Sequence, residues 1–244
     1  MIRASNSTQE PTDRAITQPR DQSHTARGPR LSVRDVGWIT RIGIVASSTQ
    51  LRDKAHRLAE VDPDAALRIA RGVPEPWFRA QALAAVARWI EDARVLSIAN
   101  ESFASAEACD DDYKRAAVSA WPIRALLERG HVEAAQRAFG HARSQALAAT
   151  PAGSRAEALL SLLQGAWRLG APTRRQLAED LLALRGQTDH WRATRALVRA
   201  LEMLSTTETE VAREIAARVD DSRCRRKALD AIQAAGACGP RDDL

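Results

Sequence analysis

The side chains of this chain that could do chemistry are scattered, and their spacing predicts no shared site. His131 and His141 are ten residues apart, a rotation of about 280° on a helix, so they cannot bind one metal ion. Cys109, Cys224 and Cys238 show no C-x-x-C spacing, which disfavours a zinc site or a disulfide framework and favours a reducing compartment. Phosphate-binding, nucleophile-elbow and zinc-protease motifs do not occur. The sequence predicts a non-enzymatic protein without cofactor or metal.

Two acidic segments resemble parts of a catalytic or cation site, but their positions are better explained as helix starts. Asp189-His190 resembles half of a catalytic dyad, and Asp110-Asp111-Asp112 resembles part of a cation site. The triple aspartate lacks the glycine-bearing loop of a calcium ligand set. Both groups precede predicted helices, where aspartate caps the free N–H groups and meets the positive end of the helix dipole. We interpret both as helix caps.

Aromatic and cationic residues are adjacent at three predicted helix starts: Phe78-Arg79, Tyr113-Lys114 and Trp191-Arg192. Such pairs can stack on bases and neutralise phosphates. They also arise when a packing aromatic precedes a solvent-facing arginine. The formal charge is +5 and the pI is near 9.7, and nearly all the cations are arginines, which bind phosphate and carboxylate groups as a planar fork. A basic nucleic-acid-binding protein therefore remains an alternative function.

A short pattern of alanine and phenylalanine occurs twice, about 36 residues apart. It comprises Ala99, Phe103 and Ala106, then Ala135, Phe139 and Ala142. Arg-Ala dipeptides recur at predicted helix starts, at Arg79, Arg115, Arg155 and Arg192. A fixed period of this length is typical of repeat proteins, in which each helix pair buries its apolar face by stacking on the next.

Capped, amphipathic segments of helical length fill the chain from about residue 47, and no strand pattern interrupts them. The predicted repeat units are 47–75, 77–110, 113–149, 154–186 and 190–219, followed by a final helix, 221–236. Pro122 is expected to kink or split its helix, and Gly130 to end that helix in a left-handed cap. The predicted fold is an all-α, right-handed α-solenoid of about ten helices in antiparallel pairs.

Residues 1–34 differ from the rest of the chain, because they are rich in Ser, Thr, Gln, Arg and Pro. Such a segment buries too little apolar surface to fold, so we predict a disordered tail before a repeat domain at 35–244. A more specific alternative is that this segment is an export signal of the type III kind, which would make the protein a secreted effector. The apolar patch Val36–Val45 is expected to cap the open end of the stack. With no transmembrane run or signal peptide, the predicted location is a bacterial-type cytoplasm.

The segment from Ile123 to Ala142 resembles a tetratricopeptide (TPR) repeat. Gly130 precedes the second helix, and Ala135, Phe139 and Ala142 follow at that family's spacing. About 75 residues match well. Arg94 stands where Gly130 stands in the other unit, and the usual closing proline is absent. A HEAT-like repeat, or a TPR-like protein without the strict consensus, fits the same residues.

The TPR resemblance implies that the first helix of each pair lines a groove that binds peptides. That groove would receive Gln81, Arg88, Glu91, Trp121, Arg124 and Glu128. Arg88 and Arg124 occupy equivalent positions in successive units, where two arginines could hold a carboxylate-bearing peptide. The resemblance thus implies an adaptor or scaffold that binds a peptide or helix segment of another protein, and no membrane.

Overall fold

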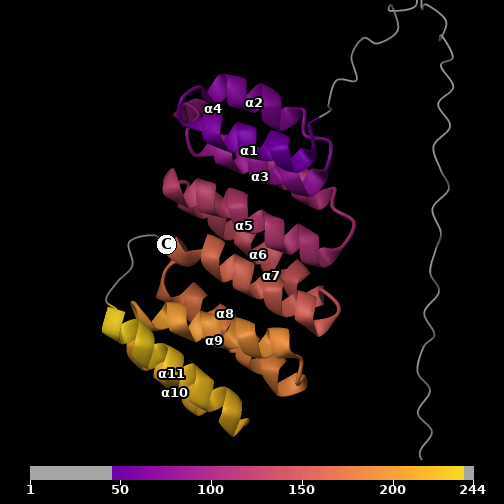
Figure 1. The fold of residues 1–244 in the computed structure, drawn as a ribbon. Helices are drawn as coiled ribbons and strands as arrows, with labels where there is room; N and C mark the ends of the chain where they lie inside the picture. The colour runs from indigo at the N-terminus through magenta and orange to yellow at the C-terminus, as the bar shows by residue number, and fades with distance from the viewer. Residues whose placement is uncertain (1–45, 239–244) are drawn as a thin grey trace, which may run out of the picture. The chain divides into compact units, whose positions relative to one another are not determined.

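The computed structural model describes residues 46–238, which form an all-α stack, as the sequence predicts (Figure 1). Eleven α-helices and one 3-10 turn make up this range. They are α1 (Ser48–Ala59), α2 (Pro63–Arg71), α3 (Pro76–Ala87), α4 (Asp92–Glu107), α5 (Asp112–Glu128), α6 (Val132–Ala148), α7 (Ala152–Gly165), η2 (Trp167–Leu169), α8 (Ala171–Gln187), α9 (Trp191–Ser205), α10 (Thr209–Ala217) and α11 (Ser222–Cys238). The predicted tail, 1–34, and the patch Val36–Val45 lie outside the described residues.

The helices form two layers, because each odd-numbered helix packs on the next odd-numbered one. The contacts run from α1 to α3, α5, α7, α9 and α11 in succession. Even-numbered helices pack chiefly on their odd-numbered neighbours in the chain. We call the surface of α1, α3, α5, α7, α9 and α11 that faces away from the even helices the odd-helix face. The arrangement is the α-solenoid that the sequence predicts, and its right-handed sense stays a prediction.

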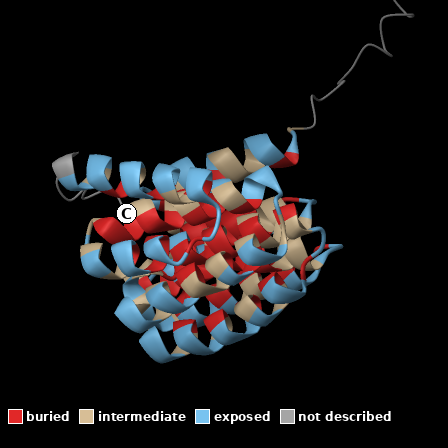
Figure 2. Ribbon diagram, turned by 90° about the horizontal axis from the view of Figure 1, so that it is seen from below, coloured by how far each residue is buried: buried red, intermediate tan, exposed pale blue. Residues whose placement is uncertain are grey.

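Alanine and leucine fill the interior of the stack (Figure 2). The repeated pattern lies on α4 and α6, where Phe139 and all four alanines are buried and Phe103 is partly buried against the core. Small residues let helix backbones approach closely. One close approach is at Gly165 of α7, where a Cβ atom would overlap the carbonyl group of Ala120 in α5, 2.8 Å from its carbon. The period in the sequence therefore records packing positions.

Polar pairs link successive even-numbered helices on the opposite side of the stack. They include Arg71–Glu101, Gln145–Glu107, Arg143–Asp180 and Arg175–Glu214. Where they are exposed, such pairs each contribute about 0–1 kcal/mol, so burial of apolar side chains between the helices is expected to supply most of the stability. The pair of Arg143 and Asp180 is bidentate, with both N–O distances at 2.7 Å. Much of the arginine content is thus engaged within the chain.

Arginines near the starts of four odd-numbered helices share one structural role. Each donates to the carbonyl oxygen six residues earlier: Arg79 to Val73 (3.3 Å), Arg115 to Cys109 (3.0 Å), Arg155 to Ala149 (3.1 Å) and Arg225 to Val219 (2.8 Å). These carbonyls lie just after the preceding helix, where backbone acceptors lack helical partners. Three of the four Arg-Ala dipeptides, at Arg79, Arg115 and Arg155, therefore mark a cap that joins one pair to the next. Arg192 departs from this pattern and lies over the ring of Trp191.

Gly130 ends α5 as predicted, whereas Pro122 does not divide that helix. Gly130 has φ +77° and ends α5 in a Schellman motif, in which His131 N–H donates to Leu126 O at 2.9 Å. Pro122 does not split α5, because burial of this helix against α3, α6 and α7 outweighs one lost backbone bond. α7 ends at Gly165, and the 3-10 turn η2 follows it.

Candidate functional site

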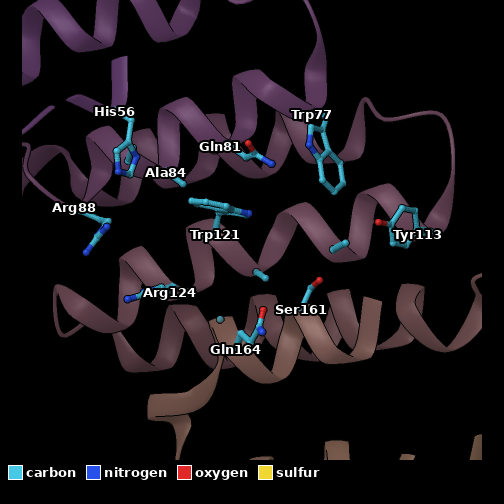
Figure 3. A pocket seen from close by; sticks show the side chains of 14 residues that line it. His56, Trp77, Gln81, Ala84, Arg88, Tyr113, Trp121, Arg124, Ser161 and Gln164 are labelled. Carbon is cyan, nitrogen blue, oxygen red and sulfur yellow. The ribbon is translucent and has the colours of Figure 1, made fainter. Parts of the chain in front are cut away.

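A hollow of about 330 Å³ opens on the odd-helix face between α1, α3, α5 and α7 (Figure 3). Its floor is made of small residues, Ala84 and Ala85 of α3, Ala117 and Ala120 of α5, and Gly165 of α7. These residues are buried, and their lack of bulk leaves the space that larger side chains would fill. The close approach of α5 and α7 at Gly165 thus also shapes the site.

Aromatic side chains form one wall of the hollow. The rings of Trp77 and Tyr113 stack with their centroids 6.2 Å apart and their planes inclined by 28°. Trp121 lies across the space between α3 and α5 and keeps 43% of its surface exposed. Exposed tryptophan in a concave site offers a large, rigid apolar surface at little entropic cost. This wall suits an apolar or aromatic ligand group.

The opposite end of the hollow is charged. Arg88, the C-cap residue of α3, and Arg124 of α5 both donate through Nε to the carboxylate of Glu128, with a 2.8 Å distance between Arg124 Nε and Glu128 Oε1. Figure 3 shows both arginines at the rim. Their Nη groups make no hydrogen bond to any described residue, so each keeps donors for a ligand. The end of the hollow offers two guanidinium groups organised by one internal carboxylate.

A buried amide lies between these two ends. Gln81 is only 5% exposed, and its Oε1 accepts from Nη1 of Arg52 at 3.0 Å. Arg52 is held in turn by Asp53 and lies over the ring of Phe78, 5.2 Å from its centroid. The amide nitrogen of Gln81 borders the hollow. A carbonyl of a ligand is the acceptor that such a fixed donor would select.

Four of the predicted groove residues line the hollow: Gln81, Arg88, Trp121 and Arg124. Glu128 lies at the rim of the hollow, where it accepts hydrogen bonds from Arg88 and Arg124. Glu91 is not at this site, because α3 ends at Ala87 and Glu91 is the exposed N-cap residue of α4. The hollow therefore gathers five of the six predicted residues, four in its lining and Glu128 beside it, and Glu91 lies outside.

Besides the small residues of its floor, five residues outside the predicted set line the hollow: Trp77, Tyr113, His56, Ser161 and Gln164. A sequence signal for the first two was present. Each α3 residue of the lining has a counterpart on α5 one period later: Trp77 with Tyr113, Gln81 with Ala117, Ala84 with Ala120, Ala85 with Trp121, and Arg88 with Arg124. No such signal pointed to α1 or α7, because their contribution depends on how the pairs stack.

Comparisons of the chain with protein-family models, with curated protein sequences and with solved structures give no match. Within residues 46–238, no three His, Cys, Asp or Glu side chains gather as a metal ion would require. In the same range no helix has the length and apolar character needed to cross a membrane. What the site can bind is therefore argued from its own geometry.

We expect the charged end to lose its structure in acid. Burial alone would raise the pKa of Glu128, but the hydrogen bonds and charges of Arg124 and Arg88 outweigh it and hold the pKa below its ordinary value of 4.5. The stability that this carboxylate contributes is then present at neutral pH and lost as the pH falls below that value. The difference in unfolding free energy between the wild type and Glu128→Gln should shrink from about pH 7 to about pH 3. Chemical denaturation measures it, and a difference independent of pH contradicts the assignment.

Proposed function

We propose that the chain is a non-enzymatic adaptor or scaffold of the TPR-like kind, which binds a peptide segment of another protein in the hollow between α1, α3, α5 and α7. The observation that carries the proposal is the convergence of an aromatic wall, a fixed amide and two arginines over a floor of small residues. Concave sites that combine apolar walls with a few placed polar groups are typical of ligand binding.

The groups of the hollow match the parts of a peptide. An apolar or aromatic side chain would pack between Trp77 and Trp121, and a backbone carbonyl would accept from the amide of Gln81. A carboxylate, from a side chain or a chain end, would reach the remaining donors of the two arginines. Each contact uses a group that the fold already holds in place, so little ordering is needed on binding.

Many arginines are already paired within the stack, which favours a peptide over a nucleic acid as the ligand. Most of the described arginines pair with acidic side chains between helices or cap backbone carbonyls at helix ends, so only a minority of the described cations remain to neutralise phosphates. A nucleic-acid complex would weaken steeply with salt, since it releases one counterion for each phosphate contact. A peptide complex in this hollow should tolerate moderate salt, because packing against tryptophan is a large part of its affinity.

The first test truncates two exposed side chains of the hollow and compares partner capture by this variant with capture by a variant that carries two matched truncations elsewhere. In Trp121→Ala with Arg124→Ala, we expect capture of the partner from nuclease-treated host lysate to fall at least tenfold, read by quantitative mass spectrometry. Trp89→Ala with Arg137→Ala is the control, because Trp89 is 46% exposed, against 43% for Trp121, and both control residues lie outside the hollow. Equal capture by the two double variants would contradict the proposal.

The arginines need a separate design, because removing them leaves Glu128 half-buried without its partners. We therefore place Arg88→Ala and Arg124→Ala in a Glu128→Gln background, which removes the carboxylate as well. Thermal stability should match that of Glu128→Gln alone, while capture of the partner is lost. Capture that survives in this triple variant would show that the arginines do not contact the ligand.

A further inference from the structure

A second hollow, of about 780 Å³, lies between α9 and α11. It is on the odd-helix face, as an ion pair shows. Arg195, which lines it, binds Glu157 of α7 with an N–O distance of 2.5 Å. Glu157 shares a helix face with Ser161 and Gln164, which line the first hollow. The two hollows therefore open on one surface, with α7 between them.

Trp191 is the most prominent apolar group of this second hollow. It stands on α9 with 59% of its surface exposed. The guanidinium groups of Arg192 and Arg195 lie 5.4 and 5.2 Å from its ring centroid, which restrains the ring through cation–π contacts. A large ring held in place yet left open to solvent offers a ready contact for an apolar side chain.

Two of the cations that line the second hollow make no ion pair with described residues. The acidic residues of the hollow are all paired with arginines: Asp189 and Asp221 with Arg185, and Glu202 with Arg199. Arg223 and Lys227, one turn apart on α11, are exposed and make no ion pair with any described residue. The α11 wall therefore presents two adjacent, uncompensated positive charges opposite an exposed tryptophan.

We propose that the groove between α9 and α11 is a second binding site, which takes an acidic peptide segment of a partner protein. Carboxylates of that segment pair with Arg223 and Lys227, while an apolar side chain beside them packs on Trp191. This site stands on its own residues and does not require the first hollow to be filled. Two helix spacings, about 16–20 Å, separate α5 from α9, and about six residues of extended peptide span that distance. One continuous partner segment is long enough to reach both hollows.

A peptide fits this groove better than a polyanion does. A nucleic acid gains affinity by neutralising many phosphates in a row, whereas only two cations of this hollow lack partners among the described residues. Asp189, 99% exposed at the side chain, stands at its edge and would repel a continuous phosphate chain. Separate carboxylates spaced along a peptide avoid that repulsion.

The test selects ligands from a random twelve-residue peptide library displayed on phage, with the full chain as bait. We expect a class of enriched peptides that carries acidic residues next to an apolar or aromatic residue. Enrichment of this class should fall at least tenfold on Arg223→Glu with Lys227→Glu, and also on Trp191→Ala. The control bait is Arg68→Glu with Arg137→Glu, which changes the net charge equally at two exposed cations of α2 and α6 that form no ion pair with described residues.

The outcomes separate this site from the first one. The proposal is supported if the acidic peptide class is no longer enriched on the α11 and Trp191 variants but is still enriched on the control bait and on Trp121→Ala with Arg124→Ala. This holds even if the first hollow proves empty. Equal loss on both charge-reversed baits means unspecific attraction and overturns it. The absence of an acidic class overturns it as well. So does displacement of the phage by a single-stranded oligonucleotide but not by an excess of the synthetic acidic peptide.

Discussion

Replacing Phe139 with alanine is expected to lower the unfolding free energy of the chain by about 3–5 kcal/mol. Phe139 is buried on α6 within the main core, between the buried alanines of the repeated pattern. Truncating its ring loses the transfer free energy of the removed atoms and leaves a cavity that rigid helices cannot close. Denaturant titration followed by circular dichroism measures the loss.

The equivalent residue of the previous unit is the natural control for Phe139. Phe103 is only partly buried, so Phe103→Ala should cost clearly less than Phe139→Ala. A loss below about 1 kcal/mol for Phe139→Ala would mean that the ring does not fill a gap between helices, and that the repeat register on α6 is wrong.

Gly165→Ala should destabilise the stack by about 1–3 kcal/mol, although alanine is the better helix former. A methyl group at this position would overlap the backbone carbonyl of Ala120, and a backbone group cannot move aside as a flexible side chain can. α5 and α7 must separate, which opens the core and deforms the floor of the first hollow. Thermal unfolding measures the cost, and partner capture should fall with it.

Gly140 on α6 is a matched control with the opposite expected sign. No atom lies within 4 Å of the position that a Cβ would take there, so Gly140→Ala should stabilise the chain by about 0.5–1 kcal/mol. If both variants are stabilising, α5 and α7 do not approach each other as closely as Gly165 and Ala120 indicate. The pair of variants thus tests the close contact between α5 and α7 at Gly165.

Most of the helices and their order could be predicted from local patterns in the sequence. Helix starts at Asp62 and Asp111, the cap at Gly130 and the recurrent Ala–Phe–Ala spacing all depend on neighbours within a few residues, so the amino-acid sequence alone is enough to predict them. Equivalent positions such as Arg88 and Arg124 were visible for the same reason. Glu91 lies outside the hollow because α3 ends at Ala87 and Glu91 is the N-cap residue of α4.

The partners of side chains could not be predicted in this way. Glu128 closes onto Arg88 from the preceding pair, Arg52 fixes Gln81 across two odd-numbered helices, and Glu157 meets Arg195 across two others. These contacts join residues about one repeat apart, so they depend on the spacing and rotation of stacked helices. Local periodicity in the sequence carries no information about that geometry. The chain's own pattern determines that helices form and which face of each is apolar. Stacking decides which arginines are already engaged and where two hollows open on the odd-helix face, because both depend on distances between helices.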